Sequence, residues 1–419
     1  MSGPLDSIRA GGARLAPWFV AALGLTIPVS VAADHILMVL FLAAWLVAWR
    51  VDRVAAAVRE VPVVTAACAL FGLLLLGGLW GPGDARDFTH YLGKYKELAF
   101  IALWLPWFAD PKWRDRAIGA LLAILGVTLL GSWASGLGVW EHLGPDRGPH
   151  NPTVFKNQIT HNYLMAFGAF LFLMKAIEPG AAWRRGLFAV AALLAAVNVL
   201  AMVRGRTGYV VLVVLALYLV FSRLRWRARV VLVIAMVAGL ATLYETAPFF
   251  RERIELGIDE ARAWQPGAGS VTSIGIRLDY WSTSLAIIRD HPLVGVGTGG
   301  FERAYTAQVQ GSGVPPSNNP HNQYLLLTAQ LGLPGLAAFI GLLVVAWRAA
   351  RRLPTAFETD AARGLVLALA SGSVFNSLLL DHTEGMLFSW LVAVLYGGYR
   401  RSEPAAVGRA REVDAVERR

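Results

Sequence analysis

Four basic side chains lie next to long apolar stretches of the sequence, where they could hold an anion at a membrane surface. Arg204 and Arg206 occupy the short turn "MVRGRTG", Arg277 lies in "SIGIRLDYW", and His321 ends "PPSNNPH" just before an apolar stretch of membrane width. The planar guanidinium group grips phosphate oxygens in pairs and does not lose its charge. These residues therefore predict a site for an anion such as the diphosphate head of a lipid.

Arg147, Lys156 and His161 lie in the segment "GPDRGPHNPTVFKNQITHNY" and belong to the same expected face of the membrane. Arg147 and His161 are candidate ligands of the diphosphate, and His161 opens an apolar stretch as His321 does. Each has a structural alternative, which is a solvated loop charge for Arg147 and a helix cap for His161. Lys156 is interpreted as a solvated charge rather than as a ligand.

The first four residues have structural alternatives as well. Arg204 could extend to lipid headgroups, and Arg277 could pair with Asp279 or another nearby acid. His321 could be an interfacial anchor or a helix cap, which its position alone favours. Arg206 lies in "GRTG", where two glycines allow a close approach of the backbone, and this favours a functional role.

The sequence lacks the signatures of nucleotide and metal sites. The stretch "GVGTGG" (Gly295–Gly300) fits a dinucleotide-binding glycine pattern, but it does not follow a strand of a βαβ unit, so it is interpreted as a backbone turn. No two histidines have the spacing of metal ligands on one helix turn, and Cys68 is the only cysteine. The other acidic candidates are scattered: Asp279, Asp290, Asp381 and Glu384. We expect no metal and no cofactor.

The elements that must position these residues are membrane-spanning helices. The chain has 419 residues, 56% of them hydrophobic, and many apolar stretches approach the roughly 20 residues that cross a bilayer. The predicted fold is an all-α membrane protein with about twelve transmembrane helices and one long periplasmic loop containing amphipathic helices. The expected spans are 15–33, 35–49, 61–80, 98–109, 117–140, 161–177, 186–202, 208–221, 230–247, 322–347, 363–380 and 386–399.

The distribution of positive charge predicts the orientation of these spans. Most of the 38 lysine and arginine residues fall in segments that twelve spans would leave in the cytoplasm, together with both termini. Topology thus explains the net charge of +10 without a nucleic-acid partner. The expected organisation is nine spans in 1–247, a periplasmic loop over 248–321 with helices near 249–263 and 276–289, three spans in 322–400 and a cytoplasmic tail over 401–419.

Three motifs, in order, resemble the O-antigen ligase and O-antigen polymerase superfamily of bacterial membrane glycosyltransferases. They are "RGRTGYVVL", "IRLDYWSTSLAIIRDHPLVGVGTGGF" and "PHNQYLLLTAQLGLPGLAAF". The resemblance covers roughly residues 145–345 and implies functional arginines at Arg206 and Arg277 and a functional histidine at His321. Many members have serine before the arginine of the first motif, so the choice between Arg204 and Arg206 stays open.

The resemblance implies transfer of a glycan from undecaprenyl diphosphate to an acceptor at the periplasmic face of the inner membrane. Fixed arginines could stabilise the departing diphosphate without a metal. A neutral His321 could accept the proton of the acceptor hydroxyl, and nearby cations would lower its pKa. A single displacement of this kind inverts the sugar carbon. Phe155, Tyr163 and Tyr209 could contact the polyprenyl tail, although interfacial packing explains them equally well.

The resemblance favours an O-antigen ligase whose acceptor is a sugar of the lipid A–core. A polymerase that extends the glycan on its carrier, or an oligosaccharyltransferase that acts on protein, is the alternative within the same superfamily. A transporter is a third reading, but it would place charges along a path through the membrane. In this sequence, nearly every charge falls at the end of an expected span.

Overall fold

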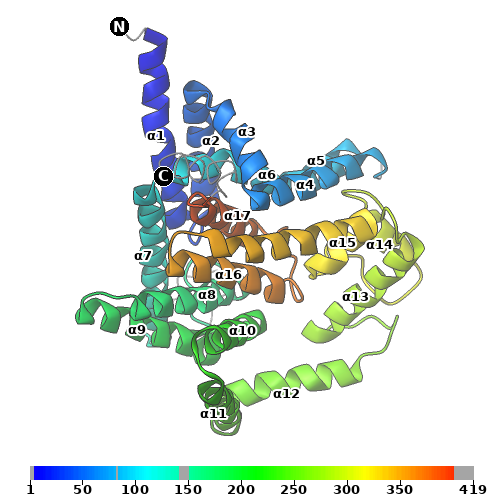
Figure 1. Cartoon of the computed structure of the whole chain (residues 1–419). Helices are drawn as coiled ribbons and strands as arrows, with labels where there is room; N and C mark the ends of the chain where they lie inside the picture. Colours follow the sequence, from blue (N-terminus) through cyan, green and yellow to red (C-terminus); the bar gives the residue numbers. More distant parts are fainter. Residues whose placement is uncertain (1–3, 82–83, 141–150, 401–419) are drawn as a thin grey trace, which may run out of the picture.

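The computed structural model describes residues 4–81, 84–140 and 151–400, and every regular element in these ranges is a helix (Figure 1). The first half contains α1 (Pro4–Thr26), α2 (Val31–Ala48), α3 (Val51–Glu60), α4 (Pro62–Leu76), η1 (Gly77–Leu79), α5 (Ala85–Lys94), α6 (Lys96–Trp104), η2 (Leu105–Phe108), α7 (Pro111–Gly136), α8 (Gln158–Ile177), α9 (Ala182–Val197) and η3 (Asn198–Met202). The second half contains α10 (Arg206–Arg223), α11 (Trp226–Thr246), α12 (Pro248–Ala263), α13 (Ser273–Asp290), α14 (Phe301–Val309), α15 (Gln323–Ala349), η4 (Ala350–Arg352), α16 (Ala356–Gly372) and α17 (His382–Tyr396). The predicted all-α class is confirmed.

Seven helices of the described part are long and apolar enough to cross a membrane. They are Val31–Ala48, Pro62–Leu79, Pro111–Gly136, Ala182–Met202, Arg206–Arg223, Trp226–Thr246 and Gln323–Arg352. This supports a multi-pass membrane protein. The other five expected spans coincide with α1, α6 followed by η2, α8, α16 and α17, which do not meet both conditions of length and apolarity, so a total of twelve stays a prediction.

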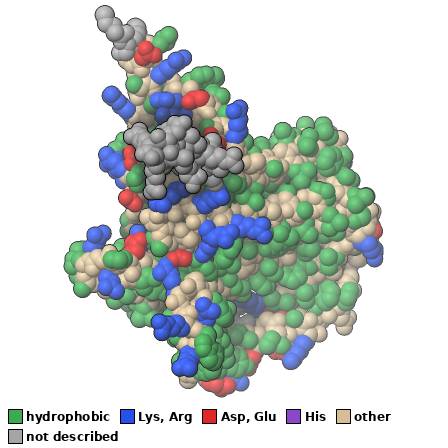
Figure 2. All heavy atoms as spheres, in the orientation of Figure 1, with side chains coloured by type: hydrophobic (Ala, Val, Ile, Leu, Met, Phe, Trp, Pro, Cys, Tyr) green, Lys and Arg blue, Asp and Glu red, His purple; other side chains and the backbone are tan. Residues whose placement is uncertain are grey.

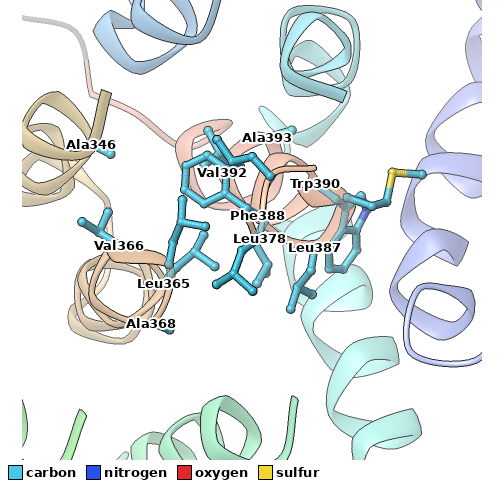
Figure 3. Close-up of a cluster of buried hydrophobic side chains, with 14 of the residues drawn as sticks. Ala346, Leu365, Val366, Ala368, Leu378, Leu387, Phe388, Trp390, Val392 and Ala393 are labelled. Atoms are coloured by element: carbon cyan, nitrogen blue, oxygen red, sulfur yellow. The ribbon is translucent and has the colours of Figure 1, made fainter. Parts of the chain in front are cut away.

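The buried centre of the molecule is α17, which is apolar on every side. Its segment "MLFSWLVAVLY" lacks a charged residue, and a helix that is hydrophobic all round is stable only when neighbours enclose it. Figure 3 shows Phe388 of α17 near side chains of α16 and of the turn at Leu378, whereas Trp390 lies on the side of α17 away from α16. The Trp390 indole donates a hydrogen bond to the carbonyl of Val20 in α1 (2.7 Å), so α17 joins the two ends of the chain.

The outer helices present the opposite pattern, with apolar side chains on the surface. No residue of α11 is buried, although its composition is that of a membrane span. Figure 2 shows a broad hydrophobic surface on the side where α14 and α15 lie, whereas most lysine and arginine side chains gather on the opposite side. Lipid-facing helices have such surfaces because the solvent around them is hydrocarbon.

α15 is broken near its middle and folds back on itself. Gly332 has a left-handed φ of 67°, and Pro334 lacks the N–H group that would continue the helix. The rings of Tyr324 and Phe339 lie 5.2 Å apart, whereas a straight helix would separate these positions by about 22 Å. The expected span 322–347 is therefore corrected to a short helix before Gly332 and a longer one after it.

Two further boundaries differ from the sequence-based expectation. The expected span 363–380 ends earlier, because α16 stops at Gly372 and a turn follows to Asp381. The expected loop 248–321 contains helices at both predicted stretches, α12 and α13, and a third helix, α14, that was not expected. The periplasmic location of the loop 248–321, the domain boundaries and the cytoplasmic location of the termini stay predictions.

Candidate functional site

The turn that carries the arginines is fastened to a neighbouring helix. α9 ends in the π-helical turn η3, and α10 begins at Arg206. Asn162 of α8 is fully buried, and its side-chain amide donates hydrogen bonds to the carbonyls of Val203 (2.9 Å) and Gly205 (3.1 Å). A Cβ atom at Gly205 would lie 2.7 Å from that amide nitrogen. The sequence thus forms this turn because glycine lets α8 approach it.

Arg206 and Arg277 converge on one cavity of about 120 Å³, although 71 positions separate them in the sequence. Arg206 is the first residue of α10, and Arg277 lies near the start of α13. Figure 1 shows where these two helices lie. Arg204 lines the same cavity. The remaining lining residues are Gln158, Ile159, Gly205, Thr207, Val210, Ser273, Ile274 and Phe375.

The Arg206 guanidinium has an ion-pair partner but no hydrogen-bond acceptor within the described residues. Its Nη1 lies 3.6 Å from Oε2 of Glu260 in α12, and all three guanidinium nitrogens are buried without a hydrogen bond. The same Glu260 oxygen accepts the N–H of Ile274 (2.8 Å), which ties α12 to the start of α13. Glu260 thus holds a carboxylate beside the cavity while the arginine's donors remain available.

Arg277 also has an N–H donor without an acceptor among the described residues. Its Nη1 donates to the carbonyl (3.2 Å) and the hydroxyl (2.9 Å) of Ser273, and its Nε is buried without an acceptor. Asp279, which the sequence offered as a partner, instead accepts hydrogen bonds from the Trp264 indole (2.7 Å) and the Ser270 N–H (2.8 Å), so that pairing is wrong. Burial and the neighbouring Arg206 charge lower the pKa of Arg277.

His321 packs against α13, the helix that carries Arg277, in a strained backbone conformation, and it does not line the arginine cavity. Its φ is +50°, its N–H donates to Asn319 Oδ1 (2.9 Å), and its ring stacks on Tyr280 of α13 with centroids 5.7 Å apart. Burial and the charge of Arg277 lower the pKa of His321. The helix-cap alternative is wrong, because Asn322 caps α15 by accepting the N–H of Leu325.

His161 does not line the arginine cavity. It is buried in α8, where its Nε2 lies 3.1 Å from Oδ1 of Asn198 in η3, and this contact favours a structural role. It is not the helix cap either, because Asn157 caps α8. Arg147 lies outside the described residues. A diphosphate-binding role for His161 or Arg147 stays a prediction.

A larger, apolar cavity of about 410 Å³ lies farther along α10, between α8, α9, α10 and α11. Leu212, Leu215 and Leu219 of α10 are among its lining residues. The aromatic residues proposed for the lipid tail lie elsewhere: Phe155 is exposed, Tyr163 is buried, and Tyr209 packs against Phe250 with ring centroids 5.6 Å apart. Sequence reasoning missed this cavity because its lining has the composition of any span.

The arrangement has the parts for binding an anion and accepting a proton. Two guanidinium groups with unused N–H donors face one cavity, and an imidazole whose lowered pKa favours its neutral form stacks on Tyr280 of the helix that carries Arg277. Such donors bind phosphate oxygens strongly where water is excluded. No group of three or more His, Cys, Asp or Glu side chains arranged for a metal ion occurs in the described ranges.

Comparison with known proteins points to the same superfamily as the three sequence motifs. Residues 190–340 match the family model described as O-antigen ligase, a segment that includes Arg206, Arg277 and His321. The match supports membership of the O-antigen ligase superfamily. An uncharacterized protein of Haemophilus influenzae (strain Rd) is 25% identical over 166 residues, which cover 38% of this chain and 42% of the relative. The chain therefore spans less than half the length of that relative.

Proposed function

We propose that the protein is an O-antigen ligase, which transfers a polysaccharide from undecaprenyl diphosphate to a sugar hydroxyl of the lipid A–core. The observation that carries the proposal is the convergence of Arg206 and Arg277 on one cavity with guanidinium donors that no described acceptor uses. Glu260 offsets only one of the two positive charges, so a second anion between the guanidinium groups would stabilise the pair. The diphosphate of a lipid carrier is such an anion.

The arginines act on the leaving group. As the bond between the sugar C1 and the diphosphate oxygen breaks, its electron pair passes to that oxygen, and Arg206 and Arg277 stabilise the developing charge. Arg204, which lines the same cavity, is the alternative to Arg206. Donors already aimed at the position where charge develops lower the barrier without reorganisation, and losing one such donor typically costs about 10²–10³ in rate.

His321 acts on the acceptor. The hydroxyl oxygen of the acceptor sugar attacks C1 from the side opposite the diphosphate, and the imidazole takes the hydroxyl proton, so the configuration at C1 is inverted. A base must be neutral to accept a proton, and the lowered pKa of His321 keeps it so at neutral pH. We propose that this reaction occurs at the periplasmic face of the inner membrane and requires neither metal nor cofactor.

Transfer between purified components tests the proposal. The protein in nanodiscs receives an undecaprenyl diphosphate-linked glycan, and lipid A–core lacking O-antigen is offered as acceptor. We expect capped lipid A–core from the wild type and loss of product from Arg206→Ala, Arg277→Ala and His321→Ala, while Arg289→Ala, which changes an exposed arginine on the same helix as Arg277, retains activity.

The products decide between the ligase and its alternative. Longer glycans on the undecaprenyl carrier, with uncapped lipid A–core, would replace the ligase by a polymerase and leave the arginine site in place. Full activity of both arginine variants would remove the proposed site.

A further inference from the structure

Five large apolar side chains form an exposed patch where the turn after α13 meets the break of α15. The outer apolar patch, as we name it, consists of Leu79, Trp80, Leu293, Val294 and Leu333. Leu79 is 82% exposed, Leu293 71%, Val294 56% and Leu333 53%. Aliphatic side chains rarely gather in this way on a surface that faces water.

Hydrogen bonds hold the three segments of the patch together. The N–H of Leu333 donates to the carbonyl of Pro292 (2.9 Å), and the Trp80 indole donates to the carbonyl of Val294 (2.9 Å). The patch is therefore a single surface built from η1, the turn and α15.

The backbone N–H groups of the second part of the turn, residues 295–300, make their hydrogen bonds inside the protein, as hydrocarbon would require. The N–H groups of residues 295–300 all donate to protein acceptors, among them the carbonyls of Ala329 and Gln330 and the side chain of Gln330. Gly295 and Gly297 have φ values of 66° and 82°, and a Cβ atom on either would lie within 2.5 Å of a neighbouring backbone atom. Irregular backbone exists at membrane depth only where such groups are satisfied.

The patch continues the surfaces of two helices that qualify as membrane spans. Exposed apolar side chains run from it along α4 (Leu75, Leu76) and along the second part of α15 (Ile340, Val344). Charged residues resume at Arg289 and Asp290, just before the turn, and at Asp87 of α5, whose backbone lies against Gly299 at the end of the turn. This continuity identifies hydrocarbon as the occupant that fits the patch, with the charged pair left at the level of the headgroups.

We infer that the turn Pro292–Gly300 is embedded in the bilayer, with Leu293 and Val294 in contact with lipid acyl chains. The segment between α13 and α14 is then not wholly aqueous, as the sequence suggested, but is anchored in the membrane. Because α13 ends at Asp290, the anchor holds the C-terminal end of that helix near the membrane surface. The inference does not depend on the reaction proposed above.

Fluorescence quenching in nanodiscs tests the inference. Cys68, the only cysteine, is replaced by alanine, and a bimane label is attached to a single new cysteine in the Leu293→Cys or Val294→Cys variant. Ile340→Cys on α15 is the lipid-exposed control, and Val271→Cys, which is 94% exposed between α12 and α13, is the aqueous control. We expect brominated lipids to quench the two turn labels as they quench Ile340→Cys, and iodide in the buffer to quench only Val271→Cys.

Quenching of the turn labels by iodide to the same extent as Val271→Cys would overturn the inference. Protection that vanishes when each nanodisc holds one chain would also overturn it, because a second copy would then be the occupant. Monodisperse elution of every labelled variant shows that the comparison concerns folded protein.

Discussion

At the scale of single residues, the site consists of charges whose partners are incomplete. The arginines were found from sequence because positive charge on the translocated side of a membrane opposes the usual bias. Their supporting residues, Asn162, Glu260 and Asn319, were not found. A polar residue within a helix or loop gives no sign of which distant group it will contact. The contacts of Asn162 and Glu260, and the hydrogen bond that Asn319 accepts from Ser377, all join separate elements.

The lowered pKa of His321 predicts the acid side of the pH–rate profile. In the proposed reaction the neutral imidazole is the active form, so we expect transfer to persist down to the lowered pKa and to fall below it. We expect the acid limb of kcat/KM to lie below about pH 6.5, the ordinary histidine value. In Arg277→Gln, residual activity should show this limb at higher pH, because the neighbouring charge is gone. A limb that does not move, measured by initial rates in nanodiscs, would contradict the base role.

Glu260 competes with the proposed donor for Arg206. Glu260→Gln removes the charge but keeps an oxygen that can accept the N–H of Ile274. A partly exposed ion pair is worth about 0.2–1 kcal/mol, so we expect a modestly lower Kd for undecaprenyl diphosphate. Asp259→Asn, which changes an exposed neighbour, is the control. Weaker binding by Glu260→Gln would mean that Glu260 orients the arginine rather than competing for it.

At the scale of elements, helix positions followed from apolar stretches and turn residues, but changes of direction did not. The segment "LGLPG" contains both residues that break α15, yet a glycine-rich span has the same composition. The fold-back packs the first part of α15, which follows His321, against the second part of the same helix. α14 was missed because nine residues of mixed polarity between turns carry little periodic signal.

The crossing of α8 and α10 should tolerate no side chain at Gly208. A Cβ atom there would lie 2.7 Å from Asn162 Cβ and 2.9 Å from its carbonyl oxygen. We expect Gly208→Ala to lower thermal stability in detergent, since such overpacking costs about 1–3 kcal/mol, and to reduce transfer by displacing Arg206. Gly239→Ala in α11, where nothing lies within 4 Å, should be neutral or slightly stabilising. Equal melting temperatures for the two variants would refute this account of the turn.

At the scale of the whole molecule, composition was enough to predict a helical membrane protein, and the family followed from three ordered motifs. The number of crossings did not follow, because short helices such as α6 and buried ones such as α17 lack the length or exposure of an ordinary span. Charge is the remaining guide to orientation, and it depends on the total count of crossings.

Reporter fusions test that orientation. The excess of positive charge predicts a cytoplasmic C-terminus and a periplasmic α12–α13 connection. Alkaline phosphatase inserted after Trp264 should therefore be active, and the same enzyme fused to the C-terminus should be inactive, whereas a green fluorescent protein fused there should fluoresce. The reverse pattern would put the arginine cavity on the cytoplasmic side and exclude periplasmic transfer.

Binding of the donor lipid is the most direct measurement of the central claim, that Arg206 and Arg277 hold a diphosphate together. The Kd for undecaprenyl diphosphate in nanodiscs is compared for wild type, Arg206→Gln, Arg277→Gln, the double variant and Arg289→Gln. A hydrogen bond to a charged group contributes about 1.5–3 kcal/mol, so each single variant should bind roughly 10- to 100-fold more weakly, the double variant should show coupling, and Arg289→Gln should match wild type. Unchanged affinity in both single variants, or an equal loss in Arg289→Gln, would contradict the account.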